Sequence, residues 1–264
     1  MSGTGGKAPG DSPGKAPAES PLPRRFYQSA TVGARDGAFA LLLDGRSART
    51  PGKRPLAVPA AGLAEAMAAE WAAQTDRIDP STMPVTRLVN TVIDGVATQA
   101  EAVRAEIVKY AGSDLLCYRA DFPADLVARQ ARAWDPVLAW AHTRLGVRFY
   151  LAEGVMPVAQ RPETADRIAA HIAALDPYRL GAVHVLMTLS GSAILALALL
   201  DGAISPADAW AAAHIDEDFQ IAQWGEDAEA AARRAHRKTE FDAAARLLTL
   251  LDRGAEPAAA PGVG

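Results

Sequence analysis

Apolar and polar residues alternate in short runs over the first part of the chain, from 25 to 59. Phe39, Leu41 and Leu43, for example, recur at every second position. Three turn sequences that contain glycine separate or follow these runs, at 34–37, 44–45 and 50–53. Alternation with a period of two between such turns is typical of β-hairpins. The pattern therefore predicts three or four short antiparallel strands.

From residue 60 onward the spacing of apolar residues becomes helical. Leu63, Met67 and Trp71 lie four residues apart, which predicts a helix over 60–74 that packs on the sheet. Further helices are predicted near 84–97, 99–112, 123–145, 162–175, 178–200, 205–236 and 238–252. One helix start stands out, because Ser205 can cap the helix and the following Pro206 suits its first position.

Together these elements predict an α+β fold, with a small N-terminal β-rich domain followed by a larger all-α orthogonal bundle. The β-rich domain with its one helix is expected at 25–80 and the helical bundle at 81–253. The two ends, 1–24 and 254–264, are rich in glycine, proline and alanine. Such composition cannot bury enough apolar surface to fold, so both ends are expected to be disordered tails.

Composition narrows the possible chemistry. Alanine supplies 59 of the 264 residues and favours helices, and the net charge of −4 argues against a nucleic-acid partner. The single cysteine, Cys117, cannot form an internal disulfide or a cysteine-rich zinc site, which fits a reducing cytoplasm. The five histidines are scattered and no glycine-rich phosphate loop follows a strand. Neither a metal nor a cofactor is therefore expected.

One uncharged stretch, Leu180–Leu200, is long enough to span a bilayer. However, it carries polar residues such as His184, Thr188 and Ser190, and no aromatic belt or positive cluster flanks it. We interpret it as a buried helix and expect no integral membrane insertion.

An acidic run, Asp216, Glu217 and Asp218, precedes Trp224 and Glu226. On a helix these acids can form a solvated face, or they can bind a basic and partly apolar protein surface. Paired carboxylates for glycoside hydrolysis are a weaker interpretation, because no sugar-stacking aromatic residues lie nearby. If the acids only keep a helix soluble, replacing all three should change stability little.

Cys117 admits an enzymatic interpretation as well. A cysteine nucleophile with His142 as its base would make a hydrolase. A lone cysteine among leucines is more often a packed small hydrophobe, and both interpretations remain open on the sequence.

Several short motifs, in this order along some 230 residues, resemble the ATP synthase assembly chaperone family. They are Arg25-Phe26-Tyr27, Leu43-Asp44-Gly45-Arg46, Arg49-Thr50-Pro51, Glu70-Trp71, Met83-Pro84, Asn90-Thr91, Tyr110, Asp114-Leu115-Leu116-Cys117-Tyr118-Arg119, Trp134-Asp135-Pro136, Gly154-Val155-Met156-Pro157, Ser190-Gly191-Ser192, Ala209-Trp210, Asp216-Glu217-Asp218-Phe219-Gln220 and Trp224-Gly225. Each motif alone is weak, whereas their order and spacing together are specific.

The resemblance implies a non-enzymatic chaperone that binds the unassembled alpha subunit of the F-type ATP synthase catalytic head and prevents its aggregation. It implies no cofactor, and it places the family's acidic position at one of Asp216, Glu217 and Asp218, with Glu226 as a second candidate. With Trp224 between these acids, we expect the five residues to form the client contact. We expect a monomer in a bacterial cytoplasm, or in the mitochondrial matrix if the chain is a processed eukaryotic member. The alternatives are the hydrolase that uses Cys117 and His142, and a stable scaffold subunit that stays in the finished complex.

Overall fold

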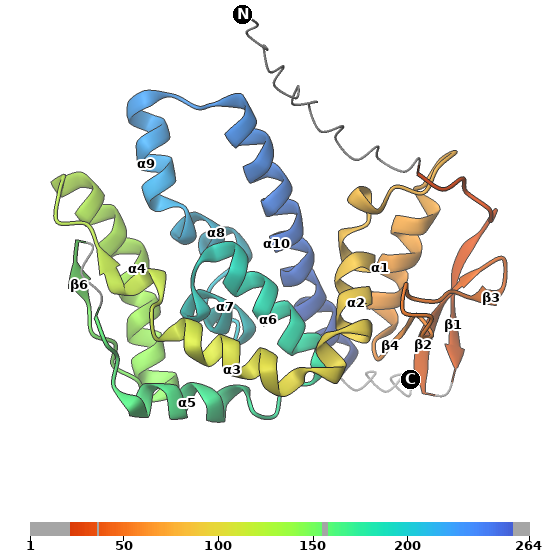
Figure 1. The fold of residues 1–264 in the computed structure, drawn as a ribbon, viewed down its shortest axis with the longest axis horizontal. Helices are drawn as coiled ribbons and strands as arrows, with labels where there is room; N and C mark the ends of the chain where they lie inside the picture. Colours follow the sequence, from red (N-terminus) through yellow and green to blue (C-terminus); the bar gives the residue numbers. More distant parts are fainter. Residues whose placement is uncertain (1–21, 36, 155–157, 256–264) are drawn as a thin grey trace, which may run out of the picture.

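The computed structural model describes residues 22–35, 37–154 and 158–255. A four-stranded antiparallel sheet stands at one end of the molecule and helices make up most of the rest (Figure 1). This arrangement confirms the predicted α+β fold. Residues 1–21 and 256–264 of the predicted tails lie outside the described residues. Pro23, within the first of these tails, accepts a hydrogen bond from the backbone N–H of Ile78 at 2.8 Å.

The sheet is built on its second strand. β2 (Ala38–Leu43) pairs antiparallel with β1 (Ala30–Arg35), with β3 (Arg46–Ser47) and with β4 (Ala57–Val58). Asp44 and Gly45 join β2 to β3 with positive φ angles of 48° and 77°, as a tight hairpin turn requires. A second sheet, in which β5 (Tyr118–Arg119) runs parallel to β6 (Ala152–Glu153), was not predicted.

The helices are α1 (Ala61–Ala72), α2 (Pro84–Asp94), α3 (Ala100–Ala111), α4 (Ala124–Leu145), α5 (Pro162–Ile172), α6 (Pro177–Ser190), α7 (Ala193–Leu200), α8 (Pro206–Ala213), α9 (Ile215–Trp224) and α10 (Ala228–Ala255), with single 3-10 turns at Pro80–Thr82, Val96–Thr98 and Leu115–Cys117. The predicted cap of α8 is confirmed, because Ser205 Oγ accepts a hydrogen bond from the N–H of Asp208 at 3.1 Å.

Two predicted helices were wrong in their extent. The expected helix over 178–200 is broken at Gly191, whose φ of 73° ends α6, and Ser192 then caps α7. The expected helix over 205–236 is three helices, because the chain bends at His214 and again after Gly225, where φ is 86°. The last helix consequently begins at Ala228 rather than near 238.

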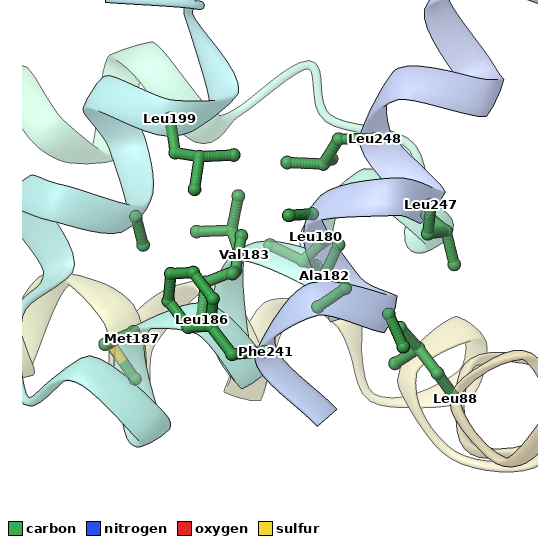
Figure 2. Packing of buried hydrophobic residues seen from close by; sticks show 14 of the residues in the cluster. Leu88, Leu180, Ala182, Val183, Leu186, Met187, Leu199, Phe241, Leu247 and Leu248 are labelled. Carbon is green, nitrogen blue, oxygen red and sulfur yellow. The ribbon is translucent and has the colours of Figure 1, made fainter. Parts of the chain in front are cut away.

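The core lies around α6, which contacts α2, α3, α7 and α10. Figure 2 shows Leu180, Val183 and Leu186 of α6 close to side chains of α10 such as Phe241. Most side chains of residues 180–200 are buried, so the interpretation of this stretch as core is confirmed, although it forms two helices and Thr188 is exposed. Within the described ranges no helix is long and apolar enough to cross a membrane.

The sheet joins this core through α1. Leu63 and Met67 of α1 and Leu41 of β2 are completely buried. α1 also contacts α2 and α10, so one apolar cluster continues from the sheet into the helices.

Candidate partner-binding site

The acidic run occupies the first turn of α9, where carboxylates oppose the positive end of the helix dipole. The structure does not place the three acids on one free face. The side-chain amide of Gln130, on α4, donates to Asp216 Oδ1 at 2.7 Å, and Gln130 Oε1 accepts from the N–H of Ala120 at 2.8 Å. Gln130 itself is buried. Asp216 therefore holds α9 against α4.

The other two acids face α10. Arg234 lies 2.5 Å from Asp218 Oδ1 and 3.8 Å from Glu217 Oε2. Their side chains remain 47% and 39% exposed, respectively, so both are open to a partner on one side. Arg234 of α10 thus folds back onto these two acids.

The predicted aromatic residue, Trp224, ends α9 and is 79% exposed. Glu226, also exposed, lies in the connection to α10. This connection forms the outer tip of the α9–α10 hairpin, away from the core (Figure 1). We call residues 224–226 the α9 tip. Of the five predicted residues, Trp224 and Glu226 lie at this tip, Glu217 and Asp218 lie about two helical turns away at the start of α9, and Asp216 has a structural role.

A hollow of about 470 Å³ lies beside the first turn of α9, between α4, α8 and α9. Ile204 and Ile215 are among its apolar lining residues, and Arg129 and Arg132 of α4 also line it. The guanidinium of Arg129 stands 5.5 Å from the ring centre of Phe219. Two arginines three residues apart on a predicted helix, Arg129 and Arg132, are a sequence signal for this hollow, but they do not show which helix lies opposite.

Many residues of the motifs have structural roles. Asp114 is completely buried and accepts hydrogen bonds from Ser192 Oγ at 2.7 Å and from the N–H of Ile194 at 3.0 Å, at the start of α7. Burial raises the pKa of the Asp114 carboxyl to about 6, although these hydrogen bonds oppose the rise. Two motifs far apart in the sequence thus form one helix cap.

Glu70, on α1, likewise caps a helix, because its carboxylate binds the start of α2. Its two carboxylate oxygens accept hydrogen bonds from the N–H groups of Val85 and Thr86, each at 2.8 Å. Burial raises the pKa of Glu70, and the hydrogen bonds from Thr86 and Val85 lower it in part. The motif at 70–71 therefore caps the helix that begins in the motif at 83–84.

Cys117 does not have the environment of a nucleophile. Its side chain is completely buried, and burial, with the nearby Asp114 charge, raises the pKa of the thiol to about 12. His142, its proposed base, is exposed on α4. The geometry therefore gives no support to the hydrolase interpretation.

A metal site finds no support either. In the ranges that the structure describes, no three or more histidine, cysteine or carboxylate side chains are grouped so that they could hold a metal ion. α9 instead carries an exposed indole at its end and half-exposed carboxylates in its first turn, which suit contact with another protein.

Comparison with solved structures identifies the class of protein, a chaperone. The structure matches that of a putative chaperone from Agrobacterium tumefaciens with a TM-score of 0.84 and 48% identity, over 88% of each chain. It also matches Atp12 from Paracoccus denitrificans with a TM-score of 0.81 and 45% identity, over 86% of this chain and 98% of that one. A mutant of the same P. denitrificans protein matches equally well, with a TM-score of 0.81.

Sequence comparison agrees. The family of the ATP12 chaperone protein matches residues 24–142. The mitochondrial protein atp12 of Schizosaccharomyces pombe is 27% identical over 227 residues, which cover 78% of this chain and 76% of that protein. The chain belongs to the ATP12 chaperone family.

Proposed function

We propose that this chain is an assembly chaperone of the F-type ATP synthase that binds the unassembled alpha subunit of the catalytic head. A subunit whose apolar interface is not yet covered by the beta subunit is prone to aggregate. A chaperone that covers this interface reversibly would prevent aggregation without any catalytic step. Membership of the ATP12 chaperone family supports the role.

The single observation that carries the proposed contact is the exposure of Trp224, at 79%, at the end of the helix whose first turn holds the half-exposed Glu217 and Asp218. Large aromatic residues at protein interfaces contribute much of the binding energy, and flanking charges select the partner and speed association. The α9 tip therefore suits a basic, partly apolar client surface.

The test is capture of free alpha subunit by the tagged, full-length chain, followed by addition of beta subunit. We expect a complex with alpha subunit that beta subunit dissociates. If the chain fails to retain alpha subunit under conditions in which both are folded, the proposal is wrong. If beta subunit joins the complex and this chain stays at equal stoichiometry, the chain is a scaffold subunit.

We further propose that the chain acts as a monomer, without enzymatic activity, in a bacterial cytoplasm or, for a processed eukaryotic chain, in the mitochondrial matrix. Light scattering on the purified chain tests the oligomeric state. A dimer that persists at low micromolar concentration would contradict this part of the proposal.

A further inference from the structure

A second hollow, of about 520 Å³, lies at the sheet end of the molecule, far from the α9 tip. The segment before β1, the β2–β3 hairpin, the residues that follow it and the end of α1 all contribute to it. Its lining residues are Phe26, Tyr27, Leu43, Asp44, Arg46, Ser47, Ala48, Arg49 and Trp71. We call it the sheet-end hollow.

Three aromatic rings form one wall of the sheet-end hollow. Phe26 packs edge-on against Tyr27 with 5.4 Å between ring centres, and Tyr27 lies 5.5 Å from Trp71. The Tyr27 hydroxyl donates to the backbone oxygen of Trp71 at 2.7 Å, which holds the Tyr27 ring against the end of α1. Phe26 is nevertheless 72% exposed. The wall is thus rigid and apolar, and one of its rings remains open to solvent.

Trp71 adds a polar feature. Its indole N–H is buried and has no acceptor among the residues that the structure describes. Such groups are rare, because an unpaired buried donor costs about 1–3 kcal/mol. The Trp71 indole is therefore a sensitive reporter of any group that enters or reshapes the hollow.

Two arginines supply positive charge. The Arg46 side chain has no partner within the described ranges, and Arg49 donates only to the backbone oxygen of Lys53, at 2.8 Å. The single acid of the hollow, Asp44, already accepts from the N–H groups of Gln28 and Ser29 and from the Ser29 hydroxyl. Both guanidinium groups therefore remain available to an anionic partner.

The charge of the surrounding segment also favours an acidic partner. Residues 22–60 contain seven arginines and lysines but only two aspartates, a net charge of +5, although the whole chain carries −4. Glu65 and Glu70 of α1, the helix that supplies Trp71, reduce this charge to +3 over residues 22–72, so the sheet end remains basic on an acidic protein. A field of this kind attracts acidic partners and raises their association rate.

We propose that the sheet-end hollow binds an extended, acidic segment of another protein, with an apolar side chain of that segment against Phe26 and its carboxylates paired with Arg46 and Arg49. Arginine forks bind carboxylates with two parallel hydrogen bonds. An extended protein segment fits better than single-stranded nucleic acid, because aliphatic side chains, Leu43 and Ala48, also line the hollow. This site is separate from the α9 tip and does not depend on the function proposed there.

The experiment uses the full-length chain and a fluorescein-labelled peptide in which leucine and proline alternate with glutamate. The matched control peptide has lysine in place of glutamate. We expect the acidic peptide to bind, and Arg46→Glu and Phe26→Ser each to weaken it at least about tenfold. Phe122→Ser and Arg233→Glu, which are exposed changes elsewhere, should leave binding unchanged. The Trp71 indole resonance should shift on titration with the acidic peptide.

Several outcomes would overturn the proposal. They are no binding up to about 1 mM peptide, equal binding of the lysine peptide, and equal binding by the Arg46→Glu variant with an unchanged melt. Displacement of the acidic peptide by a short oligothymidylate at lower concentration would show a nucleic-acid site instead. Binding only after deletion of residues 1–21 would show that this chain's own segment fills the hollow.

Discussion

At the scale of single residues, buried carboxylates hold distant segments together. Asp114 caps α7 and Glu70 caps α2, each from another part of the chain. The sequence marked both residues as parts of motifs but did not show their partners. Helix caps within one segment, such as Ser205, are readable from sequence because donor and acceptor are neighbours. The caps from Asp114 and Glu70 reach 80 and 15 residues along the chain, so they depend on tertiary packing and cannot be predicted from the sequence alone.

The Asp114 carboxyl predicts a pH dependence of stability. Its pKa is raised to about 6 in the folded protein, from about 4 when unfolded, so the folded state holds the proton more tightly. Stability from this group is therefore present at pH 4 and is lost as pH rises through 6. Asp114→Asn removes the effect. The stability difference between wild type and Asp114→Asn should be about 2 kcal/mol larger at pH 4.5 than at pH 7.5 in urea unfolding. A constant difference would contradict this assignment.

Cys117 predicts slow thiol chemistry. With a pKa of about 12, about one thiol in 10⁵ is ionised at pH 7, and the side chain is buried. We expect a thiol reagent to modify the unfolded chain in urea far faster than the native protein, and Cys117→Ala to keep alpha-subunit capture. Fast native modification, with loss of a hydrolase activity, would restore the enzymatic interpretation.

At the scale of elements, the sequence predicted most helices but misplaced the breaks. Ser190-Gly191-Ser192 lies inside an uncharged run, so its hydropathy does not indicate a helix end. The break arises because Gly191 adopts a left-handed conformation, which ends α6. Residues 228–236 belong to α10, but the prediction assigned them to the preceding helix. The predicted start of the last helix, near 238, was therefore about ten residues too late. The parallel β5–β6 pair was missed because two-residue strands carry no periodicity.

The contact between α6 and α2 predicts a size limit at Gly181. A Cβ atom there would lie 2.6 Å from Cγ2 of Val92. We expect Gly181→Ala to destabilise the protein by about 1–3 kcal/mol through overpacking. In a Val92→Ala background the same change should be neutral or stabilising, because alanine favours helix. Urea denaturation of the four proteins gives the coupling, and equal effects in both backgrounds would show that this contact does not limit packing.

The position of α9 against α4 predicts a difference between neighbouring acids. Asp216→Ala leaves the buried amide of Gln130 without its acceptor and should cost about 1–3 kcal/mol. Glu217→Ala and Asp218→Ala, at half-exposed positions, should each cost less than about 1 kcal/mol. The expectation that all three acids can be replaced without loss of stability is therefore revised. Thermal melts of the three single variants test this, and equal costs would place Asp216 on the free surface.

At the scale of the whole molecule, the structure separates two candidate contact surfaces. The α9 tip projects at one side of the helical part and the basic sheet-end hollow lies at the other end (Figure 1). The sequence indicated the residues of the tip, because acids and an aromatic residue stood close together. It could not show that Asp216 points inward, nor that residues 26, 46 and 71 meet in one hollow, since both follow from tertiary packing.

The most direct test of the central claim is alpha-subunit capture by two variants that remove equally exposed aromatic residues. Trp224 and Phe122 are 79% and 80% exposed, but only Trp224 lies at the α9 tip. We predict that Trp224→Ala lowers capture at least about tenfold with an unchanged thermal melt, while Phe122→Ala binds as wild type does. Equal capture by wild type and a well-folded Trp224→Ala variant would contradict the assignment of the α9 tip as the client-binding surface.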